Sequence, residues 1–385
     1  MDVKISDSIK YIGCNDKTLD LFESQYPVPN GVSYNSYVIL DEKIAVMDTA
    51  DPRVSDEWLA NLEKELNGRT PDYLVVSHME PDHSGTLRLF LEKYPDTVVV
   101  GNVKTFNMMC QFADVCLFEN RKHVVAEGDE LSLGQHKLTF FMAPMVHWPE
   151  VMVEYESTEK ILFTADGFGK FGALDVDEPW VDEARRYYLN IVGKYGASVQ
   201  ALLKKAATLD IQTICPLHGP ILKENIPYYI DLYNTWSSYK PEEKGVLIAC
   251  ASIHGNTKNA ALKLKEKLDA AGVKNMFIDL TRESVSEAVA RAFYYDKMVC
   301  CACTYDGGLF PPMEDFLHHL RAKAFQGRTV AFVENGTWAP QAAKCMKAVL
   351  EPLKNIEFVE PVVTIKSTLS VESEAQLTEL AAKLQ

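Results

Sequence analysis

The residues of this 385-residue chain that could bind a metal begin with the segment SHMEPDHSG, which follows the apolar run DYLVV. It carries His78, Glu80, Asp82 and His83, all of which are side chains that ligate cations. Their spacing cannot place all of them on one side of an α-helix, which turns once in about 3.6 residues. A loop at the carboxyl end of a strand, where α/β folds place their sites, would let them surround a cation.

Three further candidate ligands follow later apolar segments. His147 comes after LTFFMAPMV, Asp166 after ILFTA and His218 after QTICPL, each in a stretch that contains Pro or Gly. A single residue of this kind is more often structural or solvated than a ligand. Imidazoles and carboxylates together at the ends of successive predicted strands indicate a shared metal centre. Such mixed ligation suits non-haem iron, whereas three imidazoles would suit zinc.

A second group of residues has the composition of a phosphate and aromatic-ring site. The segment VLIACASIHGNTKN runs from a predicted strand through small and hydroxyl residues into a predicted helix. Backbone N–H groups and a helix N-terminus would therefore face a phosphate. The segment is neither a Walker loop nor GxGxxG, which disfavours a dinucleotide. Two later loops, ACTYDGGLFPP and ENGTWAP, add glycines and the aromatic residues Tyr305 and Trp338, although each feature alone has an ordinary structural explanation.

The elements that must position these residues fall into two parts. In the first part the segments 36–40 and 43–47 predict a hairpin. Mixed strands and helices predict layers of α and β structure with sheets in the middle. The predicted strands after the hairpin are 72–77, 97–101, 138–143, 151–155, 161–165 and 212–216, and the predicted helices are 55–67, one from residue 84, and 181–207.

The second part alternates regularly between strands and helices. Five β/α units predict one parallel sheet that is covered by helices on both faces. The charged segment SYKPEEKG precedes this part and places the domain boundary at 243/244, giving domains 1–243 and 244–385. The predicted strands are 246–251, 274–279, 297–302, 329–334 and 356–365, and the predicted helices are 257–271, 284–293, 312–323, 340–353 and 371–384.

Composition and charge restrict the classes of partner. A net charge of −15 disfavours nucleic acid, whose phosphates need Lys and Arg. No run of about eighteen apolar residues predicts a membrane span, and the first residues lack the pattern of a signal peptide. A cytoplasmic protein without a membrane partner is therefore expected. The nine cysteines are expected to be reduced thiols, with the Cys300–Cys303 CxxC in a buried strand.

Taken together, the two groups of motifs resemble the flavodiiron protein family. The spacing of the candidate ligands resembles the metallo-β-lactamase fold. Glu80, where hydrolases of that fold usually carry His, and the segments HWP and DGFGKFG resemble flavodiiron proteins in particular. The resemblance implies an N-terminal αβ/βα sandwich of metallo-β-lactamase type. It also implies a C-terminal doubly wound, five-stranded parallel sheet of flavodoxin type.

The resemblance also assigns the metal ligands. It implies one iron held by His78, Glu80 and His147, and a second held by Asp82, His83 and His218, with Asp166 bridging both. In some family members the position of His83 does not ligate, so that its role stays open. Trp148 and Tyr195 are candidates for residues beside the ligands, although a packed helical tyrosine is the plainer explanation of Tyr195. His123 and His136 match no ligand position and are expected at the surface.

In the second domain the resemblance implies bound FMN. Its phosphate would lie on the loop 252–257, and its isoalloxazine ring would lie between the loops 304–310 and 335–339. The implied FMN-binding residues are Ser252, Ile253, His254, Gly255, Asn256, Thr257, Thr304, Tyr305, Asp306, Gly307, Gly308, Asn335, Gly336, Thr337, Trp338 and Ala339.

The implied activity is the reduction of dioxygen to water, of nitric oxide to nitrous oxide, or of both. Electrons would come from an external carrier such as rubredoxin, or from a reduced deazaflavin, and the role would be detoxification in an anaerobe or microaerophile. The resemblance implies a head-to-tail homodimer or a dimer of dimers. Two alternatives stay open: a dizinc hydrolase, which Glu80 disfavours, and a flavin electron carrier with a purely structural metal domain. Both gases use the same ligands, so the preference between them also stays open.

Overall fold

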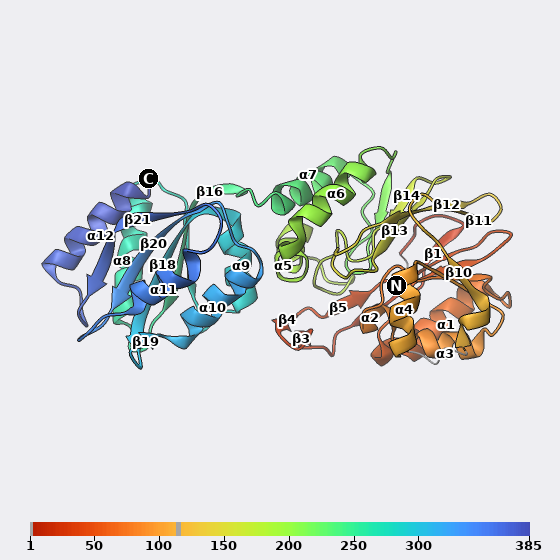
Figure 1. The fold of residues 1–385 in the computed structure, drawn as a ribbon, viewed down its shortest axis with the longest axis horizontal. Coiled ribbons are helices and arrows are strands. Elements are labelled where there is room, and N and C mark those ends of the chain that lie inside the picture. Colours follow the sequence, from red (N-terminus) through yellow and green to blue (C-terminus); the bar gives the residue numbers. More distant parts are fainter. Residues whose placement is uncertain (1–2, 113–116) are drawn as a thin grey trace. The chain divides into compact units, whose positions relative to one another are not determined.

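The computed structural model describes residues 3–112 and 117–385, so that Cys116 lies outside the described residues (Figure 1). The chain divides into two compact units. Unit 1 comprises Met1–Tyr188 and Ala197–Asn234, and unit 2 comprises Leu189–Gly196 and Thr235–Gln385. The domain boundary at 243/244 stays a prediction. No helix in the described part of the chain has both the length and the hydropathy to cross a membrane.

Unit 1 contains a six-stranded sheet with the order β1-β6-β7-β8-β9-β10. Strands β6 and β7 form the predicted antiparallel hairpin, and β7 to β10 run parallel to one another. The strand bounds are β1 Ile9–Tyr11, β6 Tyr37–Ile39, β7 Ala45–Met47, β8 Tyr73–Val75, β9 Val98–Gly101 and β10 Lys122–Val124. Two small ribbons flank the sheet: β2 Cys14–Asp16 with β5 Val32–Tyr34, and β3 Leu21–Phe22 with β4 Tyr26–Pro27.

A second sheet of unit 1 has five strands in the order β11-β12-β13-β14-β15. Its first four strands are antiparallel, and β15 joins β14 in parallel. Its bounds are β11 Glu130–Ser132, β12 Lys137–Met142, β13 Met152–Glu156, β14 Ile161–Phe163 and β15 Thr213–Cys215. Buried apolar side chains of both sheets, such as Val75 and Phe140, pack into one core between them. Stacked sheets bury their apolar faces in this way.

Helices cover the outer faces of the two sheets in unit 1 (Figure 1). The first sheet carries α1 Ser55–Leu66, α3 Leu87–Lys93 and α4 Val103–Phe112, and the second carries α5 Trp180–Ile191, α6 Gly196–Ala206 and α7 Ile226–Ser237. This arrangement confirms the predicted αβ/βα sandwich.

The single long helix predicted at 181–207 is wrong. The structure has α5 and α6 with a 3₁₀ turn, η4 Gly193–Tyr195, between them. Glycine costs about 1 kcal/mol in a helix interior relative to alanine, which favours a break here. Gly196 is also approached closely, because a Cβ atom at this position would lie 2.3 Å from the carbonyl oxygen of Ser237.

Unit 2 is built on the predicted parallel sheet, whose strands have the order β17-β16-β18-β20-β21. The bounds are β16 Glu243–Ala251, β17 Asn275–Asp279, β18 Tyr295–Tyr305, β20 Arg328–Asn335 and β21 Ile356–Ile365. The sequence did not predict β19 Gly308–Leu309, which folds back antiparallel onto the end of β18. Apolar side chains at the centres of the inner strands β16, β18 and β20 are buried, as expected for a sheet with two covered faces.

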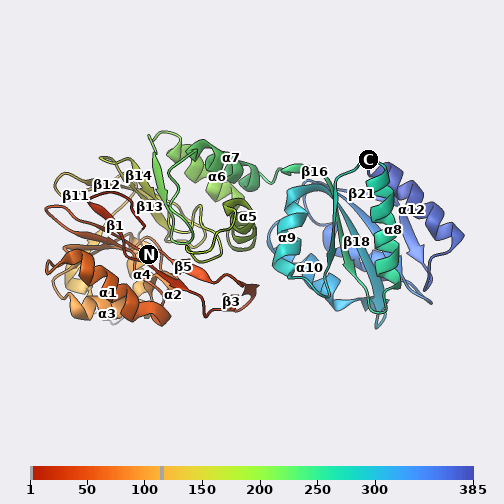
Figure 2. The same cartoon turned by 180° about the vertical axis from the view of Figure 1, so that it is seen from behind.

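Helices lie on both faces of this sheet (Figures 1 and 2). Side chains of α8 Asn256–Ala270 and α12 Val371–Lys383 share one apolar core with the strands. The opposite face carries α9 Val285–Tyr294, α10 Pro311–Ala322 and α11 Ala342–Leu350. The flavodoxin-type architecture is therefore confirmed.

Candidate functional site

The seven residues predicted as ligands lie together in unit 1 as two groups. The first group is His78, Glu80, His147 and Asp166, and the second is Asp82, His83 and His218. Within each group the potential ligand atoms lie within 4.8 Å of one another. Each residue comes from a segment that follows β8, β12, β14 or β15. Neighbouring strand ends thus bring together residues that are far apart in the sequence.

The SHMEPDHSG segment is a loop only in its first half. Pro81–Ser84 forms a single helical turn, α2, which starts after the extended residue Glu80. Proline is favoured at the first helical position, because its missing N–H would have no partner there. The turn carries Asp82 and His83 into the second group, while His78 and Glu80 belong to the first.

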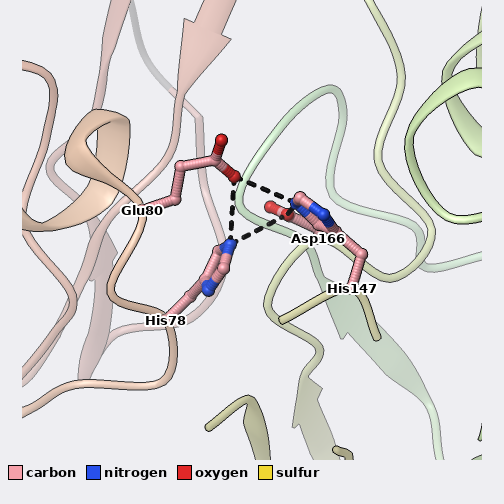
Figure 3. Close-up of side chains that lie close together, drawn as sticks. All are labelled: His78, Glu80, His147 and Asp166. Atoms are coloured by element: carbon pink, nitrogen blue, oxygen red, sulfur yellow. Dashed lines mark hydrogen bonds and ion pairs between the residues drawn. The ribbon is translucent and has the colours of Figure 1, made fainter. Parts of the chain in front are cut away.

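In the first group two imidazoles share two carboxylates (Figure 3). Oε2 of Glu80 lies 3.2 Å from Nε2 of His78 and 2.9 Å from Nε2 of His147. Oδ2 of Asp166 lies 3.4 Å from Nε2 of His78 and 3.1 Å from Nε2 of His147. The ligand atoms of all these side chains therefore converge on one point.

The second group has the same character. Nε2 of His83 and Nε2 of His218 lie 3.0 Å apart, and Oδ2 of Asp82 lies 3.4 Å and 3.3 Å from them, respectively. Oδ1 of Asp166 lies 3.3 Å from Nε2 of His83 and 3.7 Å from Nε2 of His218. The two oxygens of Asp166 therefore face different groups, as a bridging carboxylate would.

Several buried polar atoms at this site lack a hydrogen-bond partner in the described part of the chain. They include both carboxylate oxygens of Asp82 and Oδ1 of Asp166. Buried polar groups are normally hydrogen-bonded or bound to metal. The chemistry of the donors, imidazole nitrogens with carboxylate oxygens, also suits a transition metal. The residues present therefore fit a pair of metal ions.

Two of the imidazoles are held in the orientation that a metal requires. Nδ1 of His78 lies 2.8 Å from Oε1 of Glu150, which also accepts the N–H of Met79. Nδ1 of His218 lies 2.7 Å from the carbonyl oxygen of Ser33, to which it donates. Both contacts leave Nε2 free for a metal, and such partners are typical of metal-binding histidines. Glu150 and Ser33 were not predicted from the sequence, although Glu150 stands in the segment HWPE.

Without a metal, the buried charges at the site balance one another. Burial would lower the pKa of His147, but the carboxylates of Asp166 and Glu80 raise it to about 9. Burial would raise the pKa of Glu80, but hydrogen bonds from His147 and His78 lower it to about 2. The pKa of Asp166 is held well below its usual value by His78 and His147, against the effect of burial. The metal-free site therefore carries protons on imidazoles that a cation would replace.

The predicted neighbours of the ligands differ in their contacts. The ring of Trp148 lies 5.3 Å from that of His78 between centroids. Tyr195 lies in η4, within unit 2, where the ammonium of Lys194 lies over its ring. Within unit 1 the rings of Tyr187 and Tyr34 lie 5.5 Å and 6.0 Å, respectively, from the ring of His218. No signal in the sequence distinguishes Tyr187 from other helical tyrosines.

The predicted surface location of His136 is wrong. His136 is buried, and its Nδ1 lies 3.1 Å from Oε1 of Glu156, a glutamate with no exposed surface. His136 directly precedes β12, and its backbone N–H donates to Oδ2 of Asp41. His123, in the edge strand β10, is exposed as predicted.

The loops predicted to bind FMN surround a cavity of about 760 Å³ in unit 2. All the predicted FMN-binding residues except Gly255 and Gly308 line this cavity. Gly308 pairs instead with Tyr305 in the β18–β19 turn. Three lining residues, Cys303, Gln341 and Ser367, were not predicted from the sequence. Cys303 and Gln341 lie beside or near predicted loops. Ser367 follows β21, and it reaches the cavity because β21 lies next to β20 in the sheet.

The shape and chemistry of the cavity suit a flavin mononucleotide. The 15-residue helix α8 begins at Asn256 after Gly255, whose φ of +90° favours glycine. Its N-terminus would face a phosphate, which the partial positive charge of a helix start stabilises. Trp338 is 82% exposed and Tyr305 is 45% exposed, so both rings are free to contact a planar ligand. Among the described residues, no lysine or arginine lines the cavity, so neutral groups would contact the phosphate.

Comparison with known proteins agrees with this architecture. Residues 32–219 match the family model described as "ODP family beta lactamase". The chain is 29% identical over 395 aligned positions to a protein of Moorella thermoacetica named nitric oxide reductase, covering 99% of this chain and 98% of that one. It is 27% identical to the anaerobic nitric oxide reductase flavorubredoxin of Vibrio vulnificus, covering 88% of this chain and 70% of that one.

A solved structure shares the whole fold. The rubredoxin oxygen:oxidoreductase of the anaerobe Desulfovibrio gigas superposes with a TM-score of 0.91 at 24% identity, covering 99% of this chain and 97% of that one. At this identity the structural similarity shows the fold alone. The alignment with the Moorella thermoacetica protein covers nearly the whole chain. With its metallo-β-lactamase-like unit, its flavodoxin-like unit and these relatives, the chain is similar to flavodiiron proteins along nearly its whole length.

Proposed function

We propose that the chain is an oxidoreductase that uses FMN and a non-haem di-iron centre to reduce dioxygen to water, nitric oxide to nitrous oxide, or both. The observation that carries this proposal is the position of Asp166. Its two oxygens face two separate groups of ligands, so that one carboxylate can join two metal ions. The names of the relatives from Moorella thermoacetica and Desulfovibrio gigas support the choice of substrates.

In this proposal His78, Glu80 and His147 would hold one iron, Asp82, His83 and His218 would hold the other, and Asp166 would bridge them. When bound, the iron pair would supply electrons and open coordination positions for the gas, and FMN would supply electrons to the irons. The carboxylates of Glu80, Asp82 and Asp166 favour iron over zinc, because they are harder ligands than imidazole.

The protein's own groups prepare the site for this chemistry. Glu150 and Ser33 fix the tautomers of His78 and His218, so that each presents Nε2 to the metal. Glu80 stays ionised at every physiological pH, because its pKa is about 2. Apolar and aromatic side chains, including Phe22 and Tyr187, pack around His218 and limit the access of water.

The remaining parts of the proposal come from the family resemblance. An external carrier such as rubredoxin, or a reduced deazaflavin, would deliver electrons to FMN. The chain would act in the cytoplasm as a homodimer or a dimer of dimers. Its role would be detoxification of oxygen or nitric oxide.

Gas consumption by the iron-loaded, FMN-loaded protein tests this function. With a chemically reduced rubredoxin as donor, we expect nitric oxide or dioxygen to be consumed in a gas-electrode assay. A parallel ester-hydrolysis assay of zinc-loaded protein should show no turnover. Hydrolysis with zinc and no gas consumption with iron would favour the dizinc hydrolase. Flavin reduction without gas consumption would favour a simple electron carrier.

A further inference from the structure

Glu154 occupies an unusual place for an acidic residue. It is the middle residue of β13 and has 0% of its surface exposed. Its partners on the neighbouring strands are Phe140 of β12 and Phe163 of β14. Both phenylalanines belong to the core between the two sheets. Paired residues of adjacent strands point to the same face, so Glu154 points into this apolar core.

The carboxyl group of Glu154 has a single polar contact. Its Oε2 lies 3.0 Å from Oγ of Ser77, and its Oε1 has no hydrogen-bond partner among the described residues. A buried carboxylate without a cation is strongly destabilised, so that the group takes up a proton instead. Burial accordingly raises the pKa of Glu154 well above its usual value, and the negative charge of Asp48 raises it further.

Asp48, which follows β7, is the second buried acid of this cluster. Its Oδ1 accepts the backbone N–H of Ser77 at 2.8 Å and that of His78 at 3.3 Å. Burial raises the pKa of Asp48 too, but these hydrogen bonds oppose the increase. Asp48 is therefore the acid of the pair that is better stabilised as an anion.

A protonated Glu154 has a proton to donate, and Oγ of Ser77 can accept it over the 3.0 Å contact. The backbone N–H of Ser77 in turn donates to Oδ1 of Asp48. Ser77 thus links Glu154 to Asp48, and this link joins the second sheet to the loop that begins with Ser77 and His78.

We propose that Glu154 is a permanently neutral carboxylic acid and a positioning residue that orders Ser77 and Asp48, and through them the peptide groups that carry His78. Its effect on metal binding rests on the proposed function, whereas its protonation does not. Asp48 is the charged group that faces Glu154 from the first sheet. Glu156, two residues further along β13, contacts His136 and the N–H groups of Thr158 and Glu159 instead.

Infrared difference spectroscopy of the full-length, iron-loaded protein at neutral pH tests the protonation. We expect the C=O stretching band of a protonated carboxyl group in the wild type and its loss in Glu154→Gln. The matched control is Glu156→Gln, a change on the same strand in an equally buried residue without contact to Ser77, which should keep the band. Identical spectra of the wild type and Glu154→Gln in the C=O stretching region of protonated carboxyl groups would overturn the proposal.

Iron release to a chelator tests the positioning. Glu154→Gln retains a donor toward Ser77 and should release iron at the wild-type rate. Glu154→Leu removes the hydrogen bond and should release iron about tenfold faster, the lower end of the effect of residues that support metal ligands. A wild-type release rate in Glu154→Leu would refute the positioning role. If the wild type itself bound no iron, the proposed function would fail, and the infrared result alone would decide the state of Glu154.

Discussion

The two carboxylate oxygens of Asp166 face different groups of ligands, and this geometry gives the sharpest single-residue prediction. Asp166→Ala should lower the content of both irons, because each group loses an oxygen ligand and the bridge between the metals. His218→Ala should mainly deplete the second group, since His218 belongs to that group. Metal analysis of the two variants after identical loading checks this. Equal, partial loss in both variants would contradict the bridging role.

Metal uptake should depend on pH in a defined direction. The pKa of His147 in the metal-free site is raised to about 9 by Asp166 and Glu80, although burial opposes this. Below that pH a metal must displace a proton, so apparent affinity should rise with pH, by about tenfold per pH unit for each proton displaced. The stability of the metal-free protein should change with pH in the opposite direction. The raised pKa of His147 contributes stability that is fully present below its unfolded value of about 6.5 and is lost as the pH rises toward 9.

Calorimetric titrations with iron(II) in two buffers of different ionisation enthalpy would count the protons released. Release of protons at neutral pH is expected. Binding without proton release would show that the imidazoles are neutral before the metal enters.

At the residue scale the metal ligands could be predicted from the sequence, but the residues that orient them could not. Histidine, aspartate and glutamate residues at the ends of predicted strands can be recognised in the sequence. The seven predicted ligands lie in two groups. Glu150 was missed because its role depends on where Nδ1 of His78 points. Glu154 was missed because it stands in VMVEY, an alternation that also fits a glutamate on a solvent-facing side of a strand.

The start of helix α8 allows a test at the scale of an element. Gly255 has a φ of +90°, and a Cβ atom there would meet nothing within 4 Å. Gly255→Ala therefore adds backbone strain of about 1–2 kcal/mol without a clash. The phosphate loop should relax away from this conformation, and the FMN dissociation constant should rise about tenfold. Fluorescence titration of the flavin-free protein with FMN measures this.

The other end of the same helix provides the control. Gly272 also has a positive φ, +71°, and open space around it, but it follows α8 far from the cavity. Gly272→Ala should lower the stability of unit 2 by a similar amount and leave FMN affinity unchanged. If both variants weakened FMN binding equally, the effect would come from general destabilisation.

Regular elements were predictable where a simple period repeats. The β/α alternation of unit 2 and its sheet were confirmed, because each parallel strand is a short apolar run between helices. The break between α5 and α6 was not predicted, since the apolar pattern continues across it. Its cause, the close approach of Ser237 to Gly196, is a tertiary contact that a local pattern does not contain. Strand β19 was too short to show a period.

For the whole molecule, the family resemblance predicts a head-to-tail homodimer in which the flavin of one subunit serves the irons of the other. Two inactive variants should then complement each other. Asp166→Ala lacks irons, and Gly336→Phe places a large ring on the wall of the flavin cavity. Co-expressed with different affinity tags, the mixed dimer should reduce gas faster than either parent. Activity no greater than that of the parents would contradict this arrangement.

The di-iron centre itself is tested most directly by Mössbauer spectroscopy of full-length protein loaded anaerobically with iron-57 and then oxidised. Two ligand groups joined by Asp166 predict two iron ions per chain with coupled spins and a diamagnetic ground state. A single isolated paramagnetic iron, or a protein that accepts only zinc under these conditions, would contradict the assignment of the site.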